Sequence, residues 1–226
     1  RFKATFSTII FRISRYQTSK MKYVYIIRHG ETDNNKVHRF QGRGIDASIN
    51  AKGLAQAEEV ASVLQEKPIT KVVTSSLVRT LETAQPLIDQ INPVVESYRD
   101  LDEMGFGDYE GSYIHEIKEE IDQLQQRWEA GDIDHSIKGG ESPKHVFDRA
   151  GKKMQEVLRE SDDEHIAFFL HGRLIRILLS VFVGKGLVHM QEIEHCNGSI
   201  NYLTWENDEF GVIELDHRAH LSEVTV

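Results

Sequence analysis

Short apolar runs alternate with longer amphipathic segments along most of the chain, and this alternation limits the possible folds more than any other feature. The apolar runs predict β-strands, and the segments with apolar residues near helical spacing predict helices. We expect strands at residues 23–27, 71–74, 93–98, 165–170, 199–205 and 212–215, and helices at 51–65, 76–90, 113–130, 142–158 and 173–183. Strands that alternate with helices favour a parallel sheet. The sequence therefore predicts an α/β three-layer sandwich, with a mostly parallel central sheet flanked by helices on both faces.

Two prolines predict where helices begin and end. Ser142-Pro143 is typical of an N-cap residue followed by proline at the first helical position, so it predicts the start of a helix. Pro86 lies inside the helix expected at 76–90, and its missing N–H should end or kink that helix. Residues 101–111 are expected to form a loop.

The composition limits the class of partner. The chain has 226 residues, of which 39% are hydrophobic, and this is enough to bury one core in a single main domain. There are 27 Lys and Arg against 36 Asp and Glu, and the net charge of −9 argues against nucleic acid or an anionic membrane as the main partner. If the ligand is an anion, the positive charge that holds it must therefore be local.

Cysteine content and hydropathy predict the location. Cys196 is the only cysteine, so the chain cannot form an internal disulfide and has the character of a reduced, cytoplasmic protein. We interpret Cys196 as a buried bystander in preference to a reactive thiol. The apolar run at 174–183 is interrupted by Arg176, and no stretch approaches the length of a membrane span.

The first 20 residues differ from the rest of the chain. They hold five basic residues and no acidic one, and without them the net charge would fall from −9 to −14. They resemble a transit-peptide-like leader, or they extend the chain upstream of a natural start at Met21, which runs directly into the first predicted strand. We favour the second explanation. The chain is therefore divided into a leader or non-native extension at 1–20 and a domain at 21–226.

Side chains that suit phosphate chemistry follow four of the predicted strands. Arg28 and His29 follow the first strand, Arg79 the second, Glu103 the third and His171 the fourth. Each of these residues alone has a simpler explanation, as a structural histidine or a solvated charge. However, ligands of open α/β sheets bind at the carboxyl ends of the strands, so we expect the five side chains to converge there. An Arg offers a planar fork of donors that matches phosphate oxygens.

The same residues belong to an ordered set of motifs. The set comprises Arg28-His29-Gly30-Glu31-Thr32-Asp33-Asn34-Asn35, Gln41-Gly42, Ser75-Ser76-Leu77-Val78-Arg79-Thr80, Leu101-Asp102-Glu103, Phe106-Gly107-Asp108-Tyr109-Glu110-Gly111, Gly139-Gly140-Glu141-Ser142 and His171-Gly172. In this order the motifs resemble those of the histidine phosphatase superfamily, also called the phosphoglycerate mutase-like family. The resemblance covers essentially Lys22 to the C-terminus.

The resemblance implies catalytic roles. His29 is expected to be the nucleophile that forms a phosphohistidine, and Glu103 the partly desolvated proton donor to the leaving group. Arg28, Arg79 and His171 are expected to hold the phosphoryl oxygens and balance their charge. The candidate substrate-binding residues are Asn35, which matches a phosphate-contacting amide of the family, Gln41, Gly42 and Gly172.

Three further features refine this expectation. We expect no metal and no cofactor, because the remaining histidines lack the acid spacing of a zinc or two-metal phosphatase. Asn34 and Tyr109 stand where many family members carry Trp, and these changes are expected to alter the packing or the rim of the pocket without affecting a catalytic group. Glu141 has two interpretations, as a loop residue near the site or as a first-turn acid of the next helix.

The predicted function is that of a metal-independent phosphatase acting on phosphomonoesters of small metabolites. Between Glu103 and His171 there is little chain to spare for the extra segments that close over the pocket of a mutase. The alternatives are a cofactor-dependent phosphoglycerate mutase and a catalytically silent binding or scaffold member of the fold. The expected partner is a small phosphorylated metabolite, with no nucleic acid or membrane, and the chain is expected to be a monomer or a homodimer.

Overall fold

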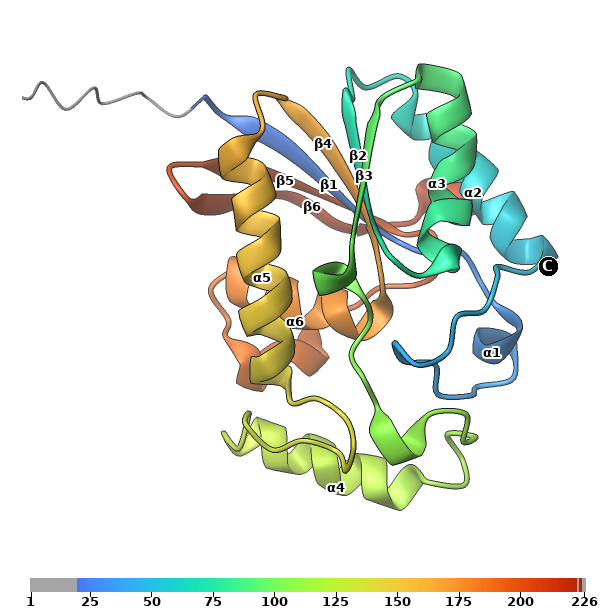
Figure 1. The fold of residues 1–226 in the computed structure, drawn as a ribbon, viewed down its shortest axis with the longest axis vertical. Helices are drawn as coiled ribbons and strands as arrows, with labels where there is room; N and C mark the ends of the chain where they lie inside the picture. Colours follow the sequence, from blue (N-terminus) through green and yellow to red (C-terminus); the bar gives the residue numbers. More distant parts are fainter. Residues whose placement is uncertain (1–19, 223, 225–226) are drawn as a thin grey trace, which may run out of the picture.

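The computed structural model describes residues 20–222 and 224, and these form a six-stranded sheet in the order β3-β2-β4-β1-β5-β6. The strands are β1 Lys22–Arg28, β2 Lys71–Ser75, β3 Val94–Tyr98, β4 His165–Leu170, β5 Ile200–Glu206 and β6 Glu209–His217. The first four strands are mutually parallel, and β5 and β6 add to one edge in antiparallel pairing (Figure 1). The expected mostly parallel sheet is confirmed.

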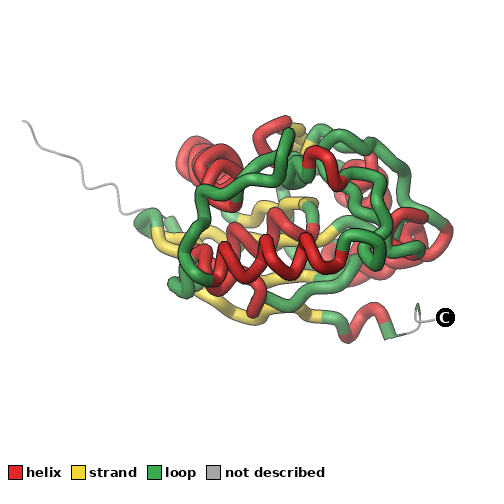
Figure 2. The backbone as a smooth tube through the Cα atoms, turned by 90° about the horizontal axis from the view of Figure 1, so that it is seen from below, coloured by secondary structure: helices red, strands yellow, loops and turns green. Residues whose placement is uncertain are grey.

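Helices cover both faces of this sheet. The helices are α1 Asp33–Lys36, α2 Ala51–Leu64, α3 Val78–Ile91, α4 Lys118–Glu129, α5 Pro143–Glu160 and α6 Gly172–Phe182. Helices α2 and α3 pack on one face, while α5 and α6 pack on the other, so the strands form the middle layer (Figures 1 and 2). Helix α4 lies apart from the sheet, at the bottom of Figure 1. The three-layer sandwich predicted from the sequence is confirmed.

Alternating side chains of each central strand enter two separate cores. In β1, Val24 and Ile26 face the core under α5 and α6, whereas Tyr25 and Ile27 face the core under α2 and α3. A strand buried on both faces needs apolar residues at every position. This explains why β1 and β4 are continuous apolar runs in the sequence.

Most predicted elements are present, with local corrections. Ser142 is the N-cap of α5, where its Oγ accepts from the backbone N–H of His145 at 3.2 Å. The helix predicted at 113–130 begins only at Lys118, because Tyr113 pairs instead with Arg39 in an isolated β-bridge. Pro86 does not end α3, which continues to Ile91 because its buried face is packed on the sheet.

Two sequence predictions concern the surroundings of the domain. The leader or extension at residues 1–20 lies, apart from Lys20, outside the described residues. Among the helices that the structure describes, none combines the length and the apolar character needed to cross a membrane.

Candidate active site

The parallel strands bring the predicted site residues to one edge of the sheet. His29 follows β1, Arg79 lies in the first turn of α3 after β2, and His171 follows β4. The ring centroids of His29 and His171 are 5.3 Å apart, and Arg79 Nε donates to His171 Nδ1 at 3.1 Å. All three side chains are buried. Three of the five side chains expected at this edge, those of His29, Arg79 and His171, therefore lie together, while their catalytic roles stay predictions.

His29 has one ring nitrogen engaged and one available. Its Nδ1 lies 2.8 Å from the carbonyl oxygen of Gly30. Because a carbonyl only accepts, Nδ1 carries the proton and Nε2 keeps its lone pair. Burial, together with the guanidiniums of Arg79 and Arg28, holds the pKa of His29 well below its usual value. The ring is therefore neutral at pH 7, which is the form that can act as a nucleophile.

His171 and Arg79 form a fixed pair. The Nδ1 atom of His171 accepts from Arg79, and its Nε2 lies 2.8 Å from the hydroxyl oxygen of Ser75. Arg79 also donates from Nη1 to the Ile45 carbonyl at 2.8 Å and from Nη2 to the Gly42 carbonyl at 3.3 Å. Burial and Arg79 hold the pKa of His171 well below its usual value. His171 is therefore a neutral ring that orients Arg79.

Arg28 is held by a histidine that the sequence analysis did not select. Arg28 Nη1 lies 3.1 Å from His195 Nδ1, and Arg176 Nε lies 3.0 Å from His195 Nε2. Burial, together with these guanidiniums, lowers the pKa of His195 to about 2, so its neutral ring accepts from one of them at a time. A Cβ on Gly172 would lie 3.1 Å from Arg28 Nε, so glycine allows this close approach.

Glu103 lies at the N-terminus of α6. Its Oε1 accepts from the backbone N–H groups of Met104 at 2.8 Å and Leu174 at 2.9 Å, and its Oε2 accepts from that of Arg173 at 3.0 Å. Only 5% of Glu103 is exposed, in agreement with the expected desolvation. These three contacts hold the carboxyl group of Glu103 against the first turn of α6.

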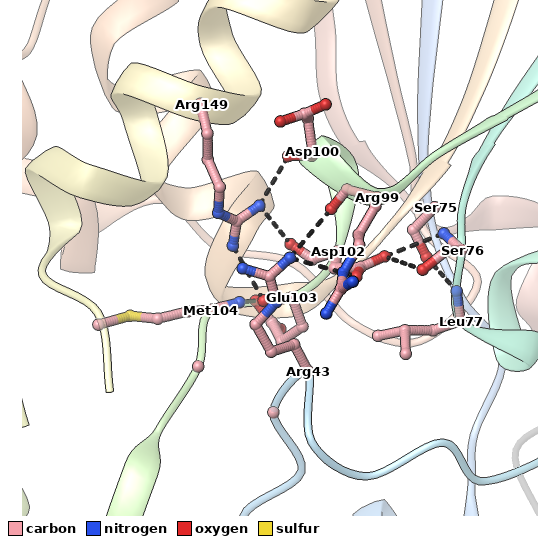
Figure 3. Close-up of polar contacts among 12 residues, drawn as sticks. Arg43, Ser75, Ser76, Leu77, Arg99, Asp100, Asp102, Glu103, Met104 and Arg149 are labelled. Atoms are coloured by element: carbon pink, nitrogen blue, oxygen red, sulfur yellow. Dashed lines mark hydrogen bonds and ion pairs between the residues drawn. The ribbon is translucent and has the colours of Figure 1, made fainter. Parts of the chain in front are cut away.

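The loop that carries Glu103 is held from two sides (Figure 3). On one side, Asp102 Oδ1 accepts from the backbone N–H of Ser76 at 2.9 Å and from its hydroxyl at 2.7 Å. On the other side, Arg149 of α5 donates to the carbonyl oxygens of Asp100, Asp102 and Glu103 at 2.6, 2.9 and 3.0 Å. These contacts fix Glu103 relative to the turn that leads into α3.

Glu141 completes the support of this loop. Its two carboxylate oxygens accept from Arg149 Nε at 2.7 Å and Arg149 Nη2 at 2.8 Å, and Oε2 also accepts from the Gly105 N–H at 2.8 Å. Because Ser142 is the N-cap of α5, Glu141 lies outside the helix. The first-turn interpretation of Glu141 is therefore wrong. Arg149 was missed because no motif connects it to the distant loop that it supports.

The remaining candidate residues lie around Arg79 and the start of α1. Asn35 Oδ1 accepts from the Thr32 N–H and from Asn197 Nδ2, both at 3.2 Å, while its Nδ2 donates to none of the described residues. This amide is available to an anion. The side-chain amide of Gln41 lies 3.0 Å from Nε and Nη1 of Arg79, and the Gly42 carbonyl accepts from the same guanidinium. Gln41 and Gly42 thus support Arg79.

Two other predictions concern groups outside this cluster. Cys196 is only partly buried and not fully buried as expected, but burial still raises the pKa of its thiol, which stays protonated at neutral pH. Within residues 20–222 and 224, no group of three or more His, Cys, Asp and Glu side chains is arranged to hold a metal ion.

Comparison with known proteins places the chain in a family. The profile of the histidine phosphatase superfamily (branch 1) matches residues 24–217. The protein named "Probable phosphoglycerate mutase GpmB" from Shigella boydii is 30% identical over 186 residues, which cover 82% of this chain and 86% of that protein.

Solved structures share the fold. A mycobacterial glucosyl-3-phosphoglycerate phosphatase in complex with VO3 superposes with a TM-score of 0.77 at 24% identity, covering 86% of this chain and 98% of that one. The alpha-ribazole phosphatase from Shigella flexneri has a TM-score of 0.75 at 22% identity, with coverage of 87% and 97%. The family profile agrees with the expected class of enzyme, a phosphoric monoester hydrolase. The chain belongs to the histidine phosphatase superfamily, branch 1.

Proposed function

We propose that the chain is a metal-independent cytoplasmic phosphatase that hydrolyses phosphomonoesters of small metabolites through a phosphohistidine on His29. The state of His29 carries this proposal, because its Nδ1 is engaged by the Gly30 carbonyl, its Nε2 is available and its ring is neutral. Arg28 and Arg79 both lie close enough to His29 to lower its pKa. A phosphate dianion between these guanidiniums would therefore meet a nucleophile.

The reaction takes two steps, and Glu103 moves the proton in both. In the first step, His29 Nε2 forms a bond to phosphorus as the ester P–O bond breaks, and the leaving oxygen takes a proton from Glu103. In the second step, water attacks phosphorus, its proton passes to the Glu103 carboxylate, and the N–P bond breaks to release phosphate. The backbone donors around Glu103 hold its carboxyl group in one position through both steps.

The identity to a protein named as a phosphoglycerate mutase supports a second candidate function, phosphoryl transfer between positions of one substrate. Hydrolysis is favoured by the short segment between Glu103 and α5, which holds a single α-helix, α4. A mutase must keep water from its phosphohistidine, and such a segment offers little cover. Incubation with a phosphoglycerate separates the two functions, since hydrolysis releases inorganic phosphate whereas transfer yields an isomer.

The nucleophile can be tested by substitution and trapping. His29→Ala should lower kcat by at least about 10³-fold, and rapid quenching of the wild-type enzyme with labelled substrate should place the label on His29. His115→Ala, at an exposed histidine, should retain activity. Near-normal turnover by His29→Ala would contradict the assignment.

The acid role of Glu103 predicts a dependence on the leaving group. Glu103→Gln should slow the hydrolysis of an alkyl phosphate much more than that of an activated aryl phosphate, whose leaving oxygen needs no proton. Equal losses on both esters would remove Glu103 from this role. Activity should persist in a chelator, and strict dependence on an added divalent metal would count against the whole proposal.

A further inference from the structure

His195 lies between two guanidinium groups and offers them a single acceptor. Its Nδ1 lies 3.1 Å from Arg28 Nη1, and its Nε2 lies 3.0 Å from Arg176 Nε. Burial and the two guanidiniums lower the pKa of His195 to about 2, so the ring is neutral at pH 7. A neutral imidazole has one N–H and one lone pair, whereas a guanidinium has donors only. One of the two contacts therefore always joins two donors, and the two arginines compete for one lone pair.

Without a phosphate, Arg28 depends on this lone pair more than Arg176 does. Among the described residues, the side chain of Arg28 has His195 as its one hydrogen-bond partner, and its buried Nε atom has none. Arg176 is also held through Nη1, which donates to the carbonyl oxygen of Gln191 at 2.9 Å and to its side-chain oxygen at 3.3 Å. A buried donor without an acceptor costs free energy. We therefore expect the lone pair of His195 on Nδ1, where it accepts from Arg28.

A bound phosphoryl group gives Arg28 a better acceptor. Arg28 lies close enough to His29 to lower the pKa of that ring, so a phosphoryl group on His29 also lies near the Arg28 guanidinium. A phosphate carries the opposite charge and matches the planar fork of donors, whereas the ring of His195 is neutral. When Nη1 of Arg28 turns to the phosphate, the lone pair of His195 becomes available to Arg176.

The change of partner takes place through the ring protons. A Cβ on Gly172 would lie 3.0 Å from His195 Cε1 and 3.1 Å from Arg28 Nε, so the ring packs closely on the backbone of α6 and keeps its position. The ring takes up a proton on Nδ1 and releases the one on Nε2, and its charge does not change. Water can carry this proton, because His195 is only partly buried.

We propose that His195 accepts from Arg28 in the free enzyme and from Arg176 when a phosphoryl group occupies the site. His195 and Arg176 are then positioning residues for the proposed reaction. The hydrogen bond that Arg176 gains adds to the affinity for phosphate, although Arg176 itself need not contact the phosphate. This inference rests on the proposed function, in which a phosphoryl group binds beside Arg28.

The position of the proton can be observed by NMR of the wild-type protein. In the full chain labelled with ¹⁵N in histidine, the chemical shifts of the two ring nitrogens show which of them carries the proton, and the signals of His195 are those missing from His195→Gln. The proton should lie on Nε2 without ligand and on Nδ1 at saturating inorganic phosphate. His115, which is exposed, should not respond. The same tautomer of His195 with and without phosphate would overturn the inference.

Variants test the coupling between Arg176 and phosphate. Arg176→Met removes the competing donor, so it should weaken the binding of inorganic phosphate, measured by calorimetry, by about 3- to 10-fold. In the His195→Phe background the same substitution should have no further effect, because the shared acceptor is absent. Arg127→Gln, which removes an exposed charge of α4 paired with Asp132, is the control and should bind phosphate normally. An effect of Arg176→Met that persists in His195→Phe comes from the charge of Arg176 alone and would refute the change of partner.

The outcomes separate this inference from the proposed function. If the wild-type enzyme hydrolyses phosphate esters and binds phosphate while the tautomer of His195 stays the same, only the change of partner is refuted. If the wild-type enzyme neither binds phosphate nor hydrolyses an ester, the proposed function fails and the change of partner fails with it.

Discussion

Substitution of Arg149 tests how the loop that carries Glu103 is held in place. Its guanidinium donates to the carbonyl oxygens of Asp100, Asp102 and Glu103 and to both carboxylate oxygens of Glu141 (Figure 3). The substitution Arg149→Gln keeps a polar side chain but removes the fork that joins α5 to the loop. It therefore leaves three carbonyl groups and one carboxylate without their main donor.

The expected loss of stability follows from the burial of this pair. Breaking a buried ion pair costs about 3–5 kcal/mol, and an exposed pair is worth about 0–1 kcal/mol. The side chains of Arg149 and Glu141 are 14% and 19% exposed, and Arg43 lies 3.4 Å from Glu141 as a remaining partner. We therefore expect Arg149→Gln to lower the free energy of unfolding by about 2–3 kcal/mol. This corresponds to a decrease in Tm of about 4–12 °C for a chain of this size.

Activity should decrease in a way that depends on the leaving group. A displacement of about 1 Å in a catalytic group can cost about 10²-fold, so kcat on an alkyl phosphate should fall by about 10- to 100-fold. The fall on an activated aryl phosphate should be smaller, because that ester does not need the proton of Glu103. Steady-state kinetics on both esters and urea unfolding measure the two effects.

Arg159→Gln provides the control on the same helix. Arg159 forms an exposed pair with Asp208, in which the side chains are 49% and 55% exposed, so its loss should cost less than about 1 kcal/mol. The reasoning is refuted if Arg149→Gln is no less stable than Arg159→Gln, or if its kcat falls equally on the alkyl and aryl esters.

Two further predictions concern stability. Burial and nearby guanidiniums hold the pKa values of His29, His171 and His195 below the value of about 6.5 in the unfolded chain, so the unfolded state binds more protons below that pH. The free energy of unfolding, measured in urea, should therefore decrease as the pH falls below about 6.5. The decrease should be up to about 1.4 kcal/mol per pH unit for each histidine. A free energy of unfolding that does not change with pH in this range would contradict the assignment of neutral rings. A Cβ on Gly53 would lie 2.3 Å from the backbone oxygen of Glu31, so Gly53→Ala should lower the free energy of unfolding by about 1–3 kcal/mol. A Cβ on Gly105 would have its nearest contact at 3.5 Å, so Gly105→Ala should lose much less stability. Equal losses of stability in the two variants would show that the contact with the backbone is not the cause.

The sequence predicted those features that depend on neighbouring residues. Apolar runs and helical spacing located the strands and most helices, because burial on one or two faces imposes a period on adjacent positions. The N-cap at Ser142 could also be predicted, because it depends on a local contact: its partner, His145, is only three residues away. Arg28, His29 and Arg79 were found because each lies at or just after the end of a strand, and parallel strands end at one edge.

Tertiary structure decided the contacts between segments that are far apart in the chain. Tyr113 pairs with Arg39 instead of entering a helix, and Arg149 donates to a loop nearly fifty residues earlier. His195 contacts Arg28 across 167 positions, and Arg173 has its charge beside Trp128. A hydrogen bond or ring contact between distant residues imposes no period and no spacing on the sequence, so only the packed fold determines which of these groups meet. The residues of the reaction were therefore visible in the sequence, but the groups that position them were not.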